Sequence, residues 1–198
     1  MSIEHSILAV LSFGPSSGYD IKSEFEHEAS GLFWGASYGS IYPKLKKLEE
    51  TGYIFALEEE DEGRKKKLYE LTKKGWLELE QWLGETPSYP IIKDELFMKM
   101  GSWHRDMDLK ILVNHLLERK KQSEHLLRFV TEWPKNGVSY IDQVGMLAIQ
   151  YAKMRLETEL LWIDRTIEMI QSGDLPKAQD TRGNAEKMIT RRRKTLQE

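Results

Sequence analysis

The chain of 198 residues contains no cysteine, which excludes disulfide bonds, thiolate metal ligands and cysteine nucleophiles. Long apolar runs are also absent, because charged residues interrupt each run well before the roughly 20 apolar residues that a membrane-spanning helix needs. The first ten residues include Glu4 and neither lysine nor arginine, unlike a secretory signal peptide. We therefore expect a cytoplasmic protein with no membrane partner.

Motifs of common enzymes are missing as well. None of the five histidines forms an HExxH pair, and the chain has neither a GxGxxG motif nor a P-loop. The run Gly14-Pro15-Ser16-Ser17-Gly18 has the composition of a turn that links two helices. We expect no catalytic residue, no metal site and no cofactor, so the protein is not expected to be an enzyme.

The net charge of −3 is spread unevenly along the chain. Residues 1–86 carry 10 Lys and Arg against 16 Asp and Glu, and residues 87–176 carry 12 against 13. Residues 177–198 carry 7 against 3, a net charge of +4. The first segment is the most acidic, so a role for it in binding nucleic acid depends on which face its cations occupy.

Apolar spacing and capping residues predict the order helix, helix, helix, hairpin, helix for residues 1–86. This order is typical of a winged helix-turn-helix, and the predicted fold class is mainly α with a small β-hairpin. The expected elements are a helix capped by Ser2 and ended by Phe13-Gly14-Pro15, a helix capped by Ser17 and Asp20, a helix from Ser37 to about Thr51, two strands within 53–71 joined by a charged tip at 61–64, and a helix capped by Thr72.

Pro87-Ser88-Tyr89-Pro90 separates this segment from a second, helical one. We expect a short helix at about 93–101, a long helix capped by Asp108, a break at 133–137 and a second long helix from Ser139 to about Ser172. The predicted domains are a winged helix-turn-helix DNA-binding domain at 1–86, a long-helix dimerisation domain at 87–176 and a basic C-terminal tail at 177–198.

The second long helix carries an apolar seam in which residues recur at steps of three and four. Its members are Ile149, Ala152, Leu156, Leu160, Ile163, Ile167 and Ile170. The seam could pack within one chain, as half of a helical hairpin, or against a second chain. We favour a homodimer, because two helices form a thin layer that buries one face poorly by itself.

The third predicted helix is the candidate recognition helix. Its buried stripe consists of Ile41, Leu45 and Leu48. Hydroxyls, tyrosines and lysines lie off that stripe and suit base edges and phosphates in a major groove, namely Ser37, Tyr38, Ser40, Tyr42, Lys44 and Lys47. The alternative is an ordinary polar surface on an amphipathic helix.

The predicted wing carries four consecutive cations, Arg64-Lys65-Lys66-Lys67, beside the turn at Gly63. At a hairpin tip, Arg64, Lys65 and Lys66 could contact the phosphates of an adjacent groove. The alternative is a ladder of opposite charges across the two strands, because five acidic residues at 58–62 precede the turn. Both arrangements are compatible if DNA competes with the ladder.

Four separated motifs across residues 6–83 resemble the PadR family of transcriptional regulators. They are Gly14-Pro15, Gly18-Tyr19-Asp20-Ile21, the segment 33–52, and the wing at 63–67 followed by Tyr69-Glu70-Leu71-Thr72 and Gly75. Lys65 stands where proline is frequent in the family. The C-terminal half resembles the larger subgroup with a virulence-activator-type helical domain, by length and helix pattern.

The resemblance implies a homodimeric transcription factor, usually a repressor, that binds double-stranded DNA; some members respond to phenolic acids or other small aromatic compounds. A small aromatic effector is therefore a candidate partner. Among six tryptophans, we expect Trp34, Trp76 and Trp82 on core faces, while Trp103, Trp133 and Trp162 could line a cavity. The acidic first segment leaves open a winged-helix protein-interaction module or a ligand sensor that does not bind DNA directly.

Overall fold

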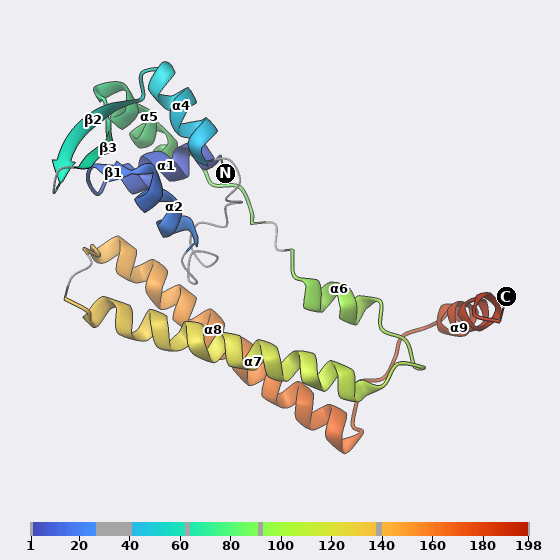
Figure 1. The fold of residues 1–198 in the computed structure, drawn as a ribbon. Coiled ribbons are helices and arrows are strands. Elements are labelled where there is room, and N and C mark those ends of the chain that lie inside the picture. Colours follow the sequence, from blue (N-terminus) through green and yellow to red (C-terminus); the bar gives the residue numbers. More distant parts are fainter. Residues whose placement is uncertain (1, 27–40, 62–63, 91–92, 138–139, 198) are drawn as a thin grey trace. The chain divides into compact units, whose positions relative to one another are not determined.

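The computed structural model describes residues 2–26, 41–61, 64–90, 93–137 and 140–197. The chain divides into two compact units, Met1–Pro90 and Ile91–Glu198, which we describe separately (Figure 1). No helix within the described ranges is long and apolar enough to cross a membrane.

The N-terminal unit has the predicted winged helix-turn-helix order. Its described elements are α1 (Ile3–Leu11), β1 (Ser16–Ser17), α2 (Gly18–Glu26), α4 (Ile41–Glu50), β2 (Ile54–Asp61), β3 (Arg64–Leu71) and α5 (Lys73–Gly84). The three strands form an antiparallel sheet in the order β1-β3-β2. The pairing of β2 with β3 extends through the charged segments 58–61 and 64–67, up to the predicted tip.

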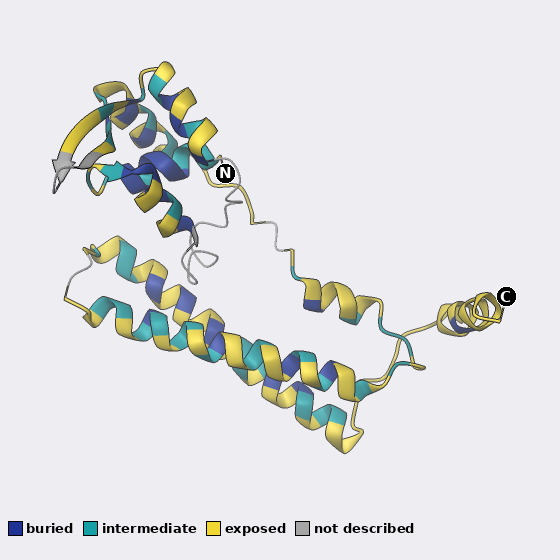
Figure 2. Ribbon diagram, viewed as in Figure 1, coloured by how far each residue is buried: buried dark blue, intermediate teal, exposed yellow. Residues whose placement is uncertain are grey.

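Apolar faces of these helices and strands meet in one core (Figure 2). The predicted stripe of the third helix is confirmed, since Ile41, Leu45 and Leu48 are all buried. The rest of the buried cluster comes from α1, α2, the sheet and α5: Ile7, Leu8, Val10, Leu11, Ile21, Phe25, Ile54, Leu71 and Leu79. This core fixes α4 against α1 and leaves the opposite side of α4 in solvent.

Local hydrogen bonds begin the helices where the sequence predicts. Ser2 and Thr72 accept hydrogen bonds from the first turns of α1 and α5. At α2, the Ser17 hydroxyl accepts from the Asp20 amide at 3.1 Å, and the Asp20 carboxylate accepts from the Ser17 amide at 3.1 Å. This reciprocal pair is the predicted capping box, with Asp in place of the usual Glu.

The C-terminal unit consists of α6 (Glu95–Gly101), α7 (Leu109–Glu132), a 3₁₀ turn η2 (Trp133–Lys135), α8 (Gln143–Ser172) and α9 (Asn184–Thr195). Asp108 caps α7 as predicted. The predicted start of the second long helix at Ser139 is wrong. Asp142 caps α8 instead, because its carboxylate accepts the Gly145 amide at 2.6 Å.

Helices α7 and α8 pack as a helical hairpin, and the apolar seam faces into it. Ile149, Ala152, Leu156 and Ile163 are at most 6% exposed in the single chain, while Leu160, Ile167 and Ile170 are partly buried. Of the two partners left open above, the seam therefore packs against its own chain. A role for these seven residues between two chains stays a prediction that their burial does not favour.

A polar network joins α6 to the hairpin. The Arg119 guanidinium donates to both oxygens of Asp94, at 2.7 and 2.8 Å, and to Glu159 at 3.0 Å. The second Glu159 oxygen accepts from the buried Ser123 hydroxyl at 2.8 Å. The hydrogen bonds from Arg119 hold the pKa of Asp94 below its usual value of 3.8. The bidentate contact between Arg119 and Asp94 holds the start of α6 against α7. Helix α6 is therefore fixed immediately after the segment that links the two units.

We expect Arg119→Met to lower the free energy of unfolding by roughly 1–3 kcal/mol, because it leaves two partly buried carboxylates without their cationic partner. Lys120→Met on the same helix is the control. It removes the more exposed pair with Asp164, so its cost should stay below about 1 kcal/mol. Urea denaturation of both variants at neutral pH measures the difference, and equal costs would contradict a structural role for the network.

The same network predicts a pH dependence. Because the folded state lowers the pKa of Asp94, the stabilisation is complete above the ordinary pKa of 3.8 and is lost as the pH falls through the lower folded value. The stability difference between the wild-type chain and Arg119→Met should therefore shrink on acidification below pH 3.8. A difference that stays constant down to about pH 2 would exclude ionised Asp94 as its source.

Candidate nucleic-acid interface

Helix α4 presents the described part of the predicted recognition surface. Tyr42 is 56% exposed, and its ring lies against Gly18 at the start of α2. A side chain at Gly18 would place its Cβ 2.8 Å from the Tyr42 ring, so the absence of that atom lets the ring occupy this position. Ser37, Tyr38 and Ser40 lie outside the described residues.

Both predicted lysines of α4 face an acidic residue of α1. The Lys44 ammonium donates to the Glu4 carboxylate at 2.7 Å, and the Lys47 ammonium lies 3.7 Å from the same oxygen. The hydrogen bond from Lys44 holds the pKa of Glu4 below its usual range. Lys44 is partly buried in this contact, whereas most of the Lys47 side chain is exposed. Lys47 is thus the α4 cation better placed to reach a phosphate.

The wing carries a ladder of opposite charges. The antiparallel register places Glu58, Glu59, Glu60 and Asp61 of β2 opposite Lys67, Lys66, Lys65 and Arg64 of β3, in that order. Four opposed pairs of unlike sign favour this register over any other, because a shift would bring apolar residues opposite charged ones. The side chains of Arg64 and Lys65 lie outside the described part of the structure.

The two described wing lysines also pair with acids outside the hairpin. Lys66 lies 3.1 Å from Asp20 of the α2 capping box, and Lys67 donates to Glu49 of α4 at 3.0 Å. The hydrogen bond from the Ser17 hydroxyl, followed by the one from Lys66, holds the pKa of Asp20 below its usual value. The Glu49 carboxylate raises the pKa of Lys67. These exposed pairs tie the wing to both helices next to it.

The sequence predicted that three tryptophans of this unit lie on core faces, and the structure describes two of them. Trp76 is 43% exposed, so its expected place on a core face is wrong; it lies on the outer side of α5. Trp82 is partly buried against the core and stacks on His5, with ring centroids 5.1 Å apart. Trp34 lies outside the described residues.

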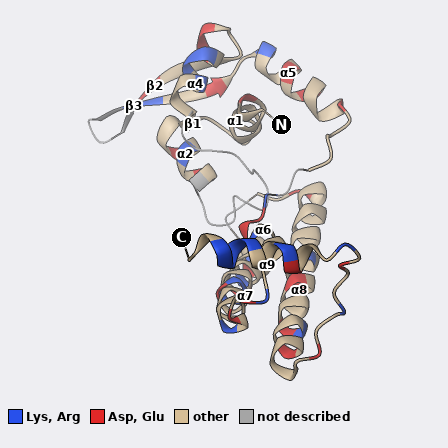
Figure 3. Cartoon of the chain, turned by 90° about the vertical axis from the view of Figure 1, so that its right-hand side faces the viewer, with Lys and Arg blue, Asp and Glu red and all other residues tan. Residues whose placement is uncertain are grey.

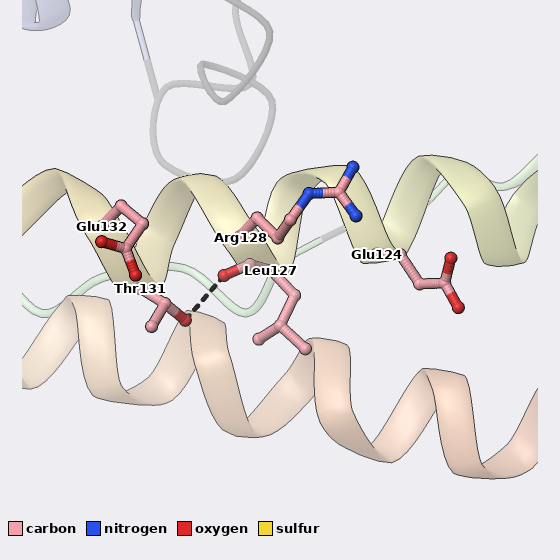
Figure 4. A pocket seen from close by; sticks show the side chains of 5 residues that line it. All are labelled: Glu124, Leu127, Arg128, Thr131 and Glu132. Carbon is pink, nitrogen blue, oxygen red and sulfur yellow. Dashed lines mark hydrogen bonds between the residues drawn. The ribbon is translucent and has the colours of Figure 1, made fainter.

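The three tryptophans of the C-terminal unit make packing contacts. Trp103 and Trp162 pack against the core of the unit, and Trp133 stacks on Phe129. The hollow drawn in Figure 4 lies on α7 and is lined by Glu124, Leu127, Arg128, Thr131 and Glu132. The described ranges also contain no cluster of His, Asp and Glu that could hold a metal ion. An effector site therefore stays a prediction.

A second apolar stripe on α8 was missed by the sequence analysis. It comprises five residues that are 52–72% exposed: Val144, Leu147, Tyr151, Met154 and Leu161. With Thr158, they recur at alternating steps of three and four, the spacing of a coiled-coil face. Leu147 and Leu156 are separated by about two and a half helical turns, so this exposed stripe lies opposite the buried seam.

Residues 7–81 match the model of the Transcriptional regulator PadR-like family. Over an alignment of 99 residues, the chain is 41% identical to the negative transcriptional regulator PadR of Bacillus subtilis. This alignment covers 49% of this chain and 54% of that protein. The chain therefore spans about half the length of the curated relatives it matches.

Among solved structures, Bacillus subtilis PadR in complex with operator DNA superposes with a TM-score of 0.68 at 28% identity, over 85% of this chain and 98% of that one. The same protein in complex with p-coumaric acid gives a TM-score of 0.62 at 25% identity, over 85% and 98%. Together with the fold, these matches confirm the resemblance inferred from the motifs: residues 7–81 form a PadR-like domain of the kind found in this family of transcriptional regulators.

Proposed function

We propose that this protein is a sequence-specific DNA-binding transcriptional regulator that acts as a homodimer, most simply as a repressor. The observation that carries the proposal is the PadR-like domain at residues 7–81, whose α4 and wing expose Tyr42, Lys47 and Lys66 on elements that occur in an operator-bound relative. In a winged helix, α4 enters the major groove and the wing contacts the adjacent backbone. Such a regulator works in the cytoplasm.

The dimer places two recognition helices on one duplex. Its operator should be pseudo-palindromic, with half-sites about one helical turn, ~10 bp, or a small multiple apart. We assign the exposed α8 stripe, from Val144 to Leu161, as its contact surface, because the buried seam is already filled by α7. Coiled-coil spacing on a solvent-facing side of a helix is best satisfied by a matching helix from a second copy.

The test uses DNA from directly upstream of the protein's own coding region, labelled for fluorescence anisotropy. Lys47→Ala should weaken binding and reduce the slope of log K against log salt by about 1. Lys73→Ala, which removes an exposed lysine at the start of α5 outside α4 and the wing, is the matched control and should leave the slope unchanged. If the wild-type chain fails to bind upstream DNA more tightly than random DNA, it is a protein-interaction module or ligand sensor instead.

A small aromatic acid is the candidate effector, because the p-coumaric acid complex belongs to a structural neighbour. Addition of p-coumaric acid should shift the tryptophan fluorescence and weaken operator binding. If the chain binds its operator and the compound changes neither the fluorescence nor the binding, the proposed DNA function stands and p-coumaric acid is not its effector.

We expect Glu4→Gln to raise the affinity for DNA by about threefold to tenfold, because Lys44 and Lys47 can then bind phosphates without first giving up their contacts with a carboxylate. Glu80→Gln, an exposed position on α5, makes the same change of charge at a site without a described ion pair. Anisotropy titrations of both variants measure the effect. Equal gains would assign it to net charge rather than to release of the two lysines.

A further inference from the structure

The C-terminal helix α9 concentrates cations that the PadR-like domain does not use. Four of its residues in succession are basic, Arg191 to Lys194, and Lys187 precedes them (Figure 3). Hydrogen bonds stabilise the first turn of this helix: the Asp180 carboxylate accepts from the backbone amides of Asn184 and Ala185 at 2.7 and 2.9 Å. The tail is thus a formed helix rather than only a charged sequence.

One side of α9 packs against its own unit. Ile189 is 1% exposed, and the residues beside it on the helix pair with the segment that precedes α7. Arg193 donates to Asp106 at 3.0 Å, Arg192 lies 3.5 Å from the same carboxylate, and Arg105 donates to Glu186. The hydrogen bonds from Arg193 hold the pKa of Asp106 below its usual range. This side of α9 is therefore occupied by structural contacts.

The opposite side of α9 carries Lys187, Arg191 and Lys194. Steps of four and three residues place these three on one face, about half a turn away from Ile189. All three are exposed, and none forms an ion pair with a described residue; the Lys187 ammonium donates to the Arg182 carbonyl. We call these three residues the α9 stripe.

We propose that the α9 stripe is a second DNA-contact site, which binds phosphates of the DNA backbone independently of base sequence. This inference rests on the proposed DNA-binding function. The stripe extends about 10 Å along the helix, which suits a row of phosphates rather than a single anion. DNA carries one charge per roughly 1.7 Å of axis, so a solvent-facing row of cations releases counterions when it binds.

The uneven distribution of charge along the chain supports a role for the α9 stripe in attracting DNA. Residues 1–86 carry a net charge of −6, and each described lysine at the candidate interface faces an acid of its own unit. Long-range attraction of DNA to that unit is consequently weak. The tail, with a net charge of +4, supplies attraction that the acidic unit lacks.

An anionic membrane is a poorer partner for α9. Helices that lie on membranes insert an apolar face opposite or beside their cations. Here the side opposite the stripe is occupied by Ile189 and by the pairs with Asp106 and Arg105. Phosphates approached from solvent are therefore the better fit.

The experiment compares the full-length protein with the triple variant K187Q/R191Q/K194Q and with the control K93Q/K110Q/K121Q. The control removes three exposed lysines of the same unit that lie on α7 or before α6. The probe is a fluorescent random-sequence duplex without operator, titrated at several salt concentrations. The α9 variant should bind about tenfold more weakly at ~0.1 M salt, with a salt slope smaller by about 2.7, whereas the control should keep the wild-type slope.

Other outcomes overturn the inference. Equal losses in both triple variants would show a general charge effect. An unchanged slope in the α9 variant would remove the stripe from the DNA interface. Loss of binding to phosphatidylserine vesicles, with DNA binding intact, would assign the stripe to a membrane. Failure of the wild-type chain to bind any duplex would instead refute the proposed function, and circular dichroism melting verifies that all variants fold.

Discussion

Gly75→Ala is expected to destabilise the protein by roughly 2–4 kcal/mol, although alanine is normally the better helix residue by about 1 kcal/mol. Gly75 lies in the first turn of α5, where that helix crosses the start of the hairpin. A Cβ at this position would lie 2.1 Å from the Tyr53 carbonyl oxygen and 3.1 Å from its carbon. Both are backbone atoms, so relief requires the helix to move away from the strand.

The geometry around Gly75 explains why such movement is costly. The Thr72 amide and hydroxyl both donate to the Tyr53 carbonyl, at 3.0 and 3.1 Å, and the same hydroxyl accepts the Gly75 amide. A shift of α5 by even a few tenths of an ångström strains the cap and the strand connection together. The effect should also disturb the wing, because β2 begins one residue after Tyr53.

Gly84→Ala is the matched control, since the same helix ends there and no atom lies within 4 Å of the new Cβ. It should be neutral or stabilising by up to about 1 kcal/mol. Thermal and urea denaturation of the two variants measure the contrast. Two variants of equal stability would mean that the close approach at Tyr53 relaxes without cost.

Replacing two residues of the exposed α8 stripe, in the variant L147E/Y151E, should convert the proposed homodimer to a monomer. Each new carboxylate would enter an apolar contact between two copies, where an unpaired charge costs several kcal/mol. Light scattering should then report the chain mass of 23.2 kDa instead of twice that value. Operator affinity should fall about a hundredfold, because the two half-sites are no longer bound together.

Two controls distinguish the stripe from the seam. Lys153→Glu changes the net charge by the same amount at an exposed position between the two faces and should leave the dimer intact. Leu156→Ala, in the buried seam, should lower the free energy of unfolding by about 2–5 kcal/mol in each chain. If L147E/Y151E stays dimeric while Leu156→Ala separates the chains, the seam is the dimer interface and our assignment of the stripe is wrong.

The sequence alone was informative wherever the deciding contacts are local. Ser2, Thr72 and Asp108 were identified as helix caps, and the Ser17 and Asp20 capping box was recognised from a spacing of three residues. The buried stripe of α4 follows from the helical repeat. Four separated motifs then indicated the PadR-like domain that residues 7–81 match.

Sequence reasoning was less informative where the partner lies far along the chain. Glu4 is 40 residues from Lys44, and Asp20 is 46 residues from Lys66, so no periodicity links these pairs. The cations were correctly placed on α4 and the wing, and the ladder across the hairpin was considered, but the pairs with Glu4 and Asp20 could not be foreseen. The start of α8 was predicted at Ser139 and lies at Asp142, because serine and aspartate both suit a helix cap and the residue type alone does not identify which one is used.

Helix α8 shows most clearly what each level decides. Its sequence specifies two apolar faces about half a turn apart, one from Ile149 to Ile170 and one from Val144 to Leu161. Either face has the spacing to meet another helix, so the sequence leaves open which face is buried. The tertiary structure decided this: α7 of the same chain buries the first face, and the second face stays exposed in the single chain, because α7 can cover only one side of α8.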